Sequence, residues 1–142
     1  MKQADEFQVY FPDLDNIEQG KEYFILEKDG KREKIVFHDY DRIYEVPGLY
    51  ESLFYDMFKC NSPKMVCDLL KKYVGNGPAQ DDIVALDIGA GNGMVGEHLS
   101  DMGAETIVGV DIISEAADAL ERDRPGLYDE YHVADLTAMA LT

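Results

Sequence analysis

The chain has 142 residues, of which 46% are hydrophobic and 30% are charged. This balance is typical of a globular protein, and one domain's length is enough to bury a core without disulfides or metals. There are 29 acidic and 13 basic residues, so the net charge is −16. DNA and RNA are therefore disfavoured as partners, because no basic stripe neutralises phosphates.

Hydropathy and cysteine content also exclude several classes of protein. No apolar run approaches the roughly 20 residues of a membrane-spanning helix. The start, MKQADEFQVYF, lacks the apolar segment of a secretory signal. We therefore expect no membrane partner and a cytoplasmic location. Cys60 and Cys67 have no second pair beside them, so the sequence predicts reduced, structural cysteines and no metal site.

Residues 1–75 are predicted to form a β-hairpin followed by a helical cap segment. Two β-rich runs flank Asp29-Gly30, and Asp-Gly is the strongest short hairpin signal. A two-residue turn there pairs Glu27 with Arg32 and Phe24 with Ile35.

The cap is predicted to contain several helical stretches. Pro47-Gly48 breaks a tyrosine-rich run into a short helical entry and a helix of about ten residues. NSPKMVCDLLKKYVG indicates a further helix, with Ser62 as N-cap, Pro63 at the first helical position and Gly75 as C-cap. The spacing of its apolar residues predicts one buried face, made of Met65, Val66, Leu69, Leu70 and Tyr73.

Residues 81–142 alternate predicted strands with predicted helices. DIVALDI, TIVGVD and EYHVAD are typical of strands. A helix from Met94 to Met102 separates the first two, and a helix with Ser114 as N-cap separates the last two. Strands that alternate with helices form parallel βαβ units with right-handed crossovers. The predicted fold class is therefore α/β, with the start of a doubly wound parallel sheet.

The turn after the first of these strands has the composition of a nucleotide-cofactor site. Gly89, Gly91 and Gly93 let the backbone pass close to a ligand in conformations that a Cβ obstructs. The following helix directs its N–H groups and positive dipole end at the same place. Asp111 and Asp135 end the next two strands, at the sheet edge where open α/β sheets bind ligands.

These residues resemble the motifs of the class I S-adenosylmethionine-dependent methyltransferases. The first motif of that family, D/E-x-G-x-G-x-G, is matched in full by DIGAGNG, from Asp87 to Gly93. VGVDI is similar to the family's second-strand motif with its acid, and VADL is similar to its third-strand motif. The resemblance covers Ile83 to Thr137, and it implies a Rossmann-like, methyltransferase-type sheet that binds S-adenosylmethionine.

The same resemblance implies a role for each matched position. The Gly89 to Gly93 backbone would approach the methionine portion, and Asp111 would hold the ribose. Tyr44 and Tyr50 are candidates to cover the cofactor from the cap. The cofactor-binding residues expected in this way are Asp87, Gly89, Ala90, Gly91, Asn92, Gly93, Asp111, Ile112, Asp135, Leu136 and Tyr44.

Gly91, Gly93 and Gly96 also fit G-x-G-x-x-G, with Asp111 about 20 residues further on. An NAD-binding oxidoreductase therefore stays open as an alternative. Asp87 disfavours it, because a carboxylate just before the turn repels a pyrophosphate and suits an ammonium group.

The resemblance also implies a seven-stranded sheet, of which this sequence supplies three strands. We therefore expect a truncated, N-terminal portion of a methyltransferase whose first strand has an unpaired edge. A homodimer through that edge, or the hairpin folding over it, would cover it.

As an enzyme, the protein would methylate a small molecule or a protein. As a non-catalytic module, it would bind the cofactor or a partner chain without turnover. We name no catalytic residue, because His38, His98 and His132 each suit a structural or surface role.

Overall fold

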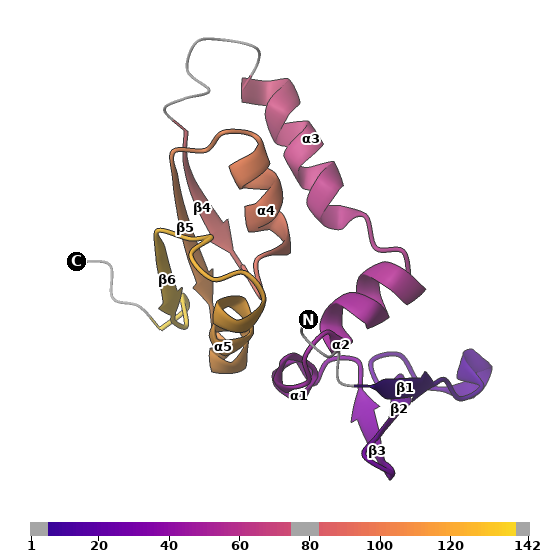
Figure 1. The fold of residues 1–142 in the computed structure, drawn as a ribbon. Coiled ribbons are helices and arrows are strands. Elements are labelled where there is room, and N and C mark those ends of the chain that lie inside the picture. Colours follow the sequence, from indigo (N-terminus) through magenta and orange to yellow (C-terminus); the bar gives the residue numbers. More distant parts are fainter. Residues whose placement is uncertain (1–5, 75–82, 139–142) are drawn as a thin grey trace.

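The computed structural model describes residues 6–74 and 83–138. It contains an antiparallel sheet of order β1-β2-β3 and a parallel sheet of order β4-β5-β6, with helices between and beside them (Figure 1). This mixed architecture confirms the α/β class and the parallel sheet that the sequence predicts. Within the described residues, no helix is both long and apolar enough to cross a membrane.

The antiparallel sheet contains the predicted hairpin. It is made of β1 (Phe7–Tyr10), β2 (Tyr23–Lys28) and β3 (Lys31–Val36), and a short 3-10 turn spans Leu14–Asn16. Asp29 and Gly30 both have positive φ, 53° and 72°, which a two-residue type I′ turn requires. Phe24 pairs with Ile35 and Glu27 with Arg32, as predicted. β1 was not expected, because four residues give too short an alternating pattern to recognise.

Two short helices follow the hairpin. They are α1 (Tyr40–Glu45) and α2 (Leu49–Glu51), and α2 continues into a π-helical stretch, Ser52–Met57. Gly48 separates them with φ of 76°, so the predicted break falls where the structure has one. We call residues 6–57 the N-terminal segment. Its core joins the hairpin to these helices and consists of Phe24, Leu26, Ile35, Ile43, Val46, Leu49 and Leu53.

The next helix, α3 (Ser62–Val74), begins at Ser62, one residue before the predicted first helical position, and its buried face also differs from the prediction. Cys67 is buried and Leu70 is partly buried against Leu99 and Ile107. By contrast, four of the five residues predicted to be buried are at least half exposed: Met65, Val66, Leu69 and Tyr73. The apolar arc of α3 is wider than the surface that α4 and the sheet offer it. Gly75, the predicted C-cap, lies outside the described residues.

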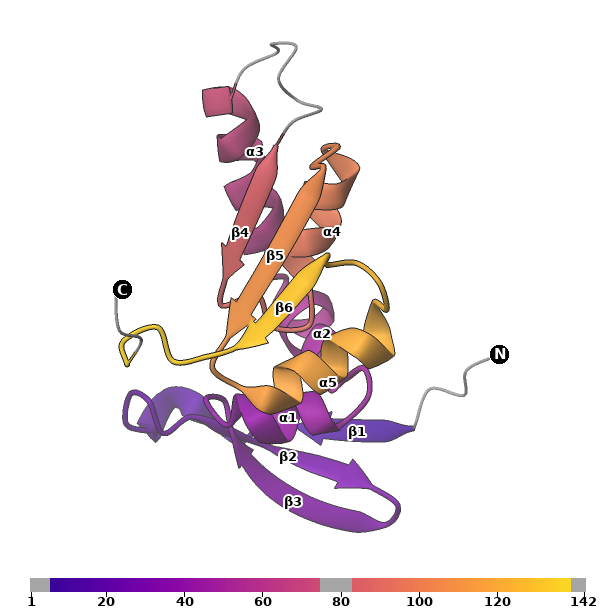
Figure 2. The same cartoon turned by 90° about the vertical axis from the view of Figure 1, so that its left-hand side faces the viewer.

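The parallel sheet has its helices on one face. Its strands are β4 (Val84–Ile88), β5 (Thr106–Asp111) and β6 (Glu130–Val133), connected by α4 (Met94–Asp101) and α5 (Ser114–Asp123). Figure 2 shows the three strands in front, with α3, α4 and α5 behind them. Ser114 is not the N-cap of α5. Ile113 holds that position, and the Ser114 hydroxyl bonds to Glu115 instead.

The opposite face of this sheet is open along β4, which is an edge strand in the described part of the chain. Val84, Leu86 and Ile88 point to that face and are 69%, 61% and 64% exposed. The hairpin was one of the two covers expected for this edge, but it does not pair with β4. In the described residues, its strands β2 and β3 pair with each other, and β2 also pairs with β1.

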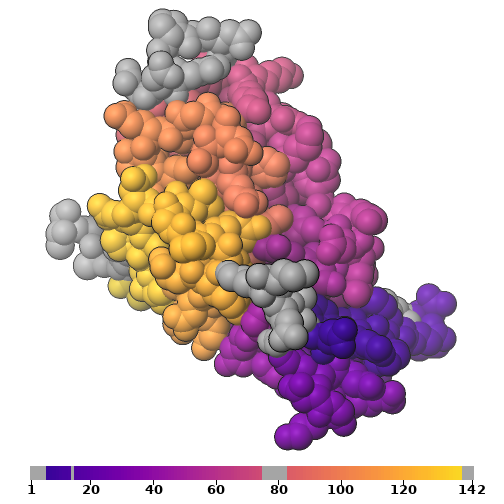
Figure 3. Space-filling model, in the orientation of Figure 1, coloured from indigo at the N-terminus to yellow at the C-terminus, as the bar shows by residue number. Residues whose placement is uncertain are grey.

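The N-terminal segment contacts the parallel sheet through α5. Tyr44 of α1 packs against Ala116 and Ala119, and the space-filling view shows the residues of α5 meeting those of the N-terminal segment (Figure 3). This contact places α1 and α2 beside the turn that follows β4.

Candidate functional site

The glycine turn, residues Gly89–Gly93, leaves β4 and enters α4 in conformations that favour glycine. Gly89, Gly91 and Gly93 have φ of 74°, 56° and 94°, a region that side chains with a Cβ rarely adopt. The N–H groups of Gly89 and Ala90 donate to the Val110 carbonyl at 2.8 and 3.1 Å. The turn is therefore held against the end of β5.

Asp111 forms hydrogen bonds with two backbone segments at this edge of the sheet, the glycine turn and the segment after β5. Its Oδ2 accepts a hydrogen bond from the Gly91 N–H at 2.9 Å, and its Oδ1 accepts one from the Ile113 N–H at 3.0 Å. The residue is 9% exposed. A carboxylate has about four lone-pair sites, so this side chain keeps acceptor capacity for a ligand while it shapes the turn.

A hollow of about 250 Å³ opens at the carboxyl ends of β4, β5 and β6. We call it the sheet-edge hollow. A Cβ added at Gly89 would meet nothing within 4 Å, so the backbone here borders open space. The hollow is lined by Ile88, Gly89, Val110, Asp111, Ile112, Ala134, Asp135 and Leu136. Five of the residues expected to bind a cofactor therefore lie around one hollow: Gly89, Asp111, Ile112, Asp135 and Leu136.

The rim of the sheet-edge hollow is apolar and acidic. Ile112 is 64% exposed and Leu136 45%, so both present apolar surface to a ligand. The Thr137 hydroxyl and N–H donate to Asp135 Oδ1 at 2.6 and 2.9 Å. These bonds hold the pKa of Asp135 below its usual value, so the rim carries a negative charge at neutral pH.

Asp87 lies beneath the glycine turn rather than in the hollow. It is 8% exposed and belongs to the face of β4 that the helices cover. The Tyr128 hydroxyl donates to its Oδ2 at 2.6 Å. Burial raises the pKa of Asp87, the Tyr128 hydrogen bond opposes that rise, and the nearby Asp111 charge adds to it.

Asp87→Asn should raise the unfolding temperature at neutral pH. Because burial raises the folded-state pKa, the stability linked to Asp87 is complete below its ordinary pKa of about 4 and is lost as pH rises through the folded value. Asparagine does not ionise, and its amide oxygen still accepts from Tyr128. Thermal unfolding of the wild type and the variant from pH 4 to pH 8 should show that the increase in unfolding temperature grows with pH.

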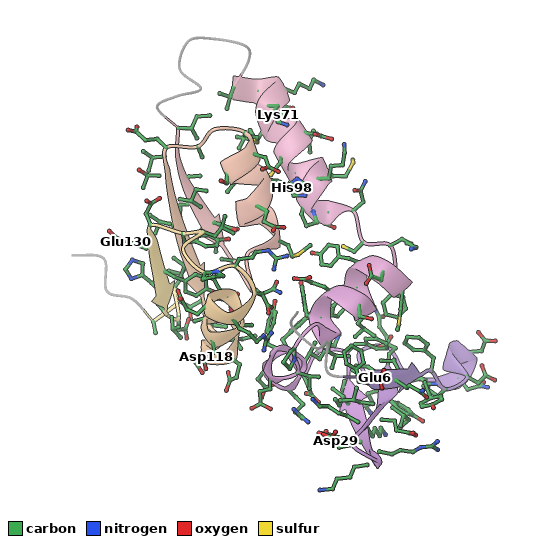
Figure 4. The ribbon with its side chains drawn as sticks, in the orientation of Figure 1. Glu6, Asp29, Lys71, His98, Asp118 and Glu130 are labelled. Atoms are coloured by element: carbon green, nitrogen blue, oxygen red, sulfur yellow. The ribbon has the colours of Figure 1, made fainter. Side chains whose placement is uncertain are left out.

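The control for this prediction is Asp118→Asn, an exposed aspartate on α5 (Figure 4). It should change the unfolding temperature little at any of these pH values. A gain from Asp87→Asn that is the same at every pH would contradict the assigned role of burial.

The other expected cofactor residues are buried around the turn. Ala90, Asn92 and Tyr44 are 6%, 1% and 5% exposed. Tyr44 stacks on Tyr50 with ring centroids 4.6 Å apart, and a Cβ at Gly91 would overlap its hydroxyl. These side chains brace the glycine turn and do not line the sheet-edge hollow.

Three bracing residues were not anticipated from the sequence. The Tyr131 hydroxyl donates to the Gly91 carbonyl at 2.8 Å, and Tyr128 reaches Asp87. Arg124 donates to the Asn92 carbonyl at 3.1 Å. The alternation in EYHVAD indicates that Tyr131 and Val133 point to the same face of their strand. This pattern could have been used to predict which side of the sheet Tyr131 occupies. We find no sequence signal for Arg124.

None of the three histidines lines the sheet-edge hollow. His98 lies on α4 (Figure 4) and is half-buried there. His132 is exposed on β6 and lies 3.0 Å from Glu130 Oε2. His38 lies in the turn after β3. The geometry therefore assigns no general base among them.

Comparison with known proteins finds no family model, no curated protein and no solved structure that matches this chain.

Proposed function

We propose that residues 83–138 form the cofactor-binding part of an S-adenosylmethionine-dependent methyltransferase, built on a Rossmann-like sheet. One observation carries the proposal. The sheet-edge hollow brings a left-handed glycine turn together with Asp111 at the end of β5 and Asp135 two residues beyond the end of β6. Ligands of open α/β sheets bind at the carboxyl ends of the strands.

The residues around the hollow fit the chemical parts of this cofactor. Asp111 is nearly buried and charge-assisted hydrogen bonds from ribose hydroxyls would use its remaining lone pairs. Ile112 and Leu136 offer apolar surface for adenine. Gly89 leaves room for the backbone to approach the methionine portion.

The bound cofactor would supply an electrophilic methyl group, and the chain would supply its position. Transfer of a methyl group to a good nucleophile needs mainly alignment of the two reactants. The glycine turn, which Asp111 and Tyr131 hold by hydrogen bonds, would provide a rigid wall for that alignment. The proposed acceptor is a small molecule or a protein.

Calorimetric titration with S-adenosylhomocysteine tests this proposal, with NAD titrated under the same conditions. Binding of S-adenosylhomocysteine alone would support it. NAD binding alone would favour the dinucleotide alternative instead. One observation favours that alternative: Gly96 allows close helix packing, because a Cβ there would lie 2.5 Å from the Tyr128 hydroxyl. Binding of neither ligand would contradict both proposals for this chain.

Ile112→Ala should weaken S-adenosylhomocysteine binding about tenfold while the unfolding temperature stays nearly unchanged. The side chain is 64% exposed and lines the hollow, so its loss removes ligand contact more than core packing. Titration and thermal unfolding of the same sample measure the two effects.

Leu86→Ala is the matched control for Ile112→Ala. Leu86 is similarly exposed, at 61%, but lies further back along β4 and away from the hollow. Its replacement should leave affinity unchanged. Equal losses in the two variants would place the ligand somewhere other than the sheet-edge hollow.

A further inference from the structure

A partly buried polar cluster joins the N-terminal segment to the glycine turn. Its centre is Arg124, at the end of α5, whose side chain is 11% exposed. Arg124 Nη1 donates to Glu51 Oε1 at 2.6 Å and to the Asn92 carbonyl at 3.1 Å. One guanidinium therefore bonds to α2 and to the turn, which are about 40 residues apart in sequence.

Asn92 makes a second link between the same parts. It is 1% exposed, and its Nδ2 donates to Glu51 Oε1 at 3.1 Å and to Asp123 Oδ2 at 3.2 Å. Burial alone would raise the pKa of Asp123, but hydrogen bonds from Arg122 and Asn92 bring it below its usual value. Asp123 therefore accepts the Asn92 amide proton as a carboxylate.

The cluster is continuous with the contact between α1 and α5. Arg122 Nη1 donates to the Tyr44 carbonyl at 2.9 Å, and a Cβ at Gly91 would overlap the Tyr44 hydroxyl. The N-terminal segment therefore contacts the glycine turn at Gly91 and at Asn92. It does so through side chains that do not line the sheet-edge hollow.

We infer that Arg124 and Glu51 are positioning residues that fix the glycine turn to the N-terminal segment, so that cofactor binding and the docking of residues 40–53 are energetically linked. The inference rests on the proposed function for the identity of the ligand. Loss of Arg124 leaves the Asn92 carbonyl and the Glu51 carboxylate without this shared donor, and the turn then loses one of the contacts that fix its position. Linkage requires that a ligand which orders the turn also tightens this docking.

The test compares Arg124→Met with Arg124→Lys and with the control Arg42→Met. Arg42 also forms a salt bridge, 2.8 Å from Glu33, but within the N-terminal segment. Amide hydrogen exchange is measured for residues 40–53 and 89–94, with and without S-adenosylhomocysteine, and affinity is measured by titration. Chemical denaturation of each variant measures its global stability.

In the unliganded protein, Arg124→Met should speed exchange in both segments more than in β2 and β5. It should also weaken S-adenosylhomocysteine binding about tenfold and abolish the protection that the ligand gives residues 40–53. Arg124→Lys should show each of these effects to a smaller extent. An ammonium group still reaches Glu51, but it has no second nitrogen with which to bond Asn92 as well. Arg42 itself lies on α1, so this control applies to the turn: Arg42→Met should leave exchange in residues 89–94 and the affinity unchanged.

The outcomes separate this inference from the proposed function. If the wild-type protein binds no S-adenosylhomocysteine, the proposed function fails, and exchange in the unliganded variants still tests the link. If Arg124→Met leaves exchange in residues 40–53 and 89–94 unchanged, or speeds exchange uniformly over the whole fold, the inference is overturned. Unchanged affinity in a variant with faster exchange also overturns it.

Discussion

Asp111→Asn is expected to destabilise the protein by about 2–3 kcal/mol and to weaken S-adenosylhomocysteine binding about 100-fold or more. The carboxylate accepts from two backbone N–H groups, those of Gly91 and Ile113, one on each oxygen. An amide has one acceptor oxygen, so its NH₂ group would face one of these donors in a nearly buried place. The loss of charge would also weaken the bonds to ribose hydroxyls.

Chemical denaturation and calorimetric titration check this expectation, with Asp135→Asn as the matched control. Asp135 lies at the same sheet edge and is exposed, so its replacement should cost less than about 1 kcal/mol of stability. It should still weaken ligand binding, because Asp135 lines the sheet-edge hollow. Equal destabilisation by the two variants would show that Asp111 does not hold the turn.

Gly96→Ala is expected to destabilise the protein by about 2 kcal/mol, although alanine is the better helix former by roughly 1 kcal/mol. A Cβ at this position of α4 would lie 2.5 Å from the Tyr128 hydroxyl oxygen and 2.7 Å from its ring carbon. Tyr128 has little freedom to move, because it bonds to Asp87 and its ring also packs over Gly109. The helix and the sheet would have to separate.

A double-mutant cycle with Tyr128→Val measures this clash by chemical denaturation. In the Tyr128→Val background, Gly96→Ala should cost almost nothing or stabilise the helix. Ser100→Ala, an exposed change in the same helix, should be close to neutral in both backgrounds. A stabilising Gly96→Ala in the wild-type background would contradict the close packing of α4 on Tyr128.

Local chemistry determined several features of this protein that sequence reading predicted. Asp29-Gly30 and the glycine turn adopt positive φ, because such conformations depend on the residue itself more than on its neighbours. The alternation of strands and helices in the second half predicted the parallel sheet. The strand end at Asp111 followed from it, and the predicted third strand, which ends at Val133 rather than at Asp135, still brings Asp135 to the sheet-edge hollow.

Only the tertiary structure decided which side chains reach that hollow and which lie beneath it. Asp87 and Asp111 are both acids near strand ends and on the same face of the sheet, yet Asp87 pairs with Gly109 and bonds to Tyr128 under the turn, whereas Asp111 lies two residues further on, at the end of β5. The exposed stripe of α3 was misassigned, since helical spacing indicates an apolar face but not how much of it a neighbour covers. The role of Arg124 depends on α2, the glycine turn and α5 meeting at one point. Contacts between segments so distant in sequence leave no local pattern, and the packing of the whole chain creates them.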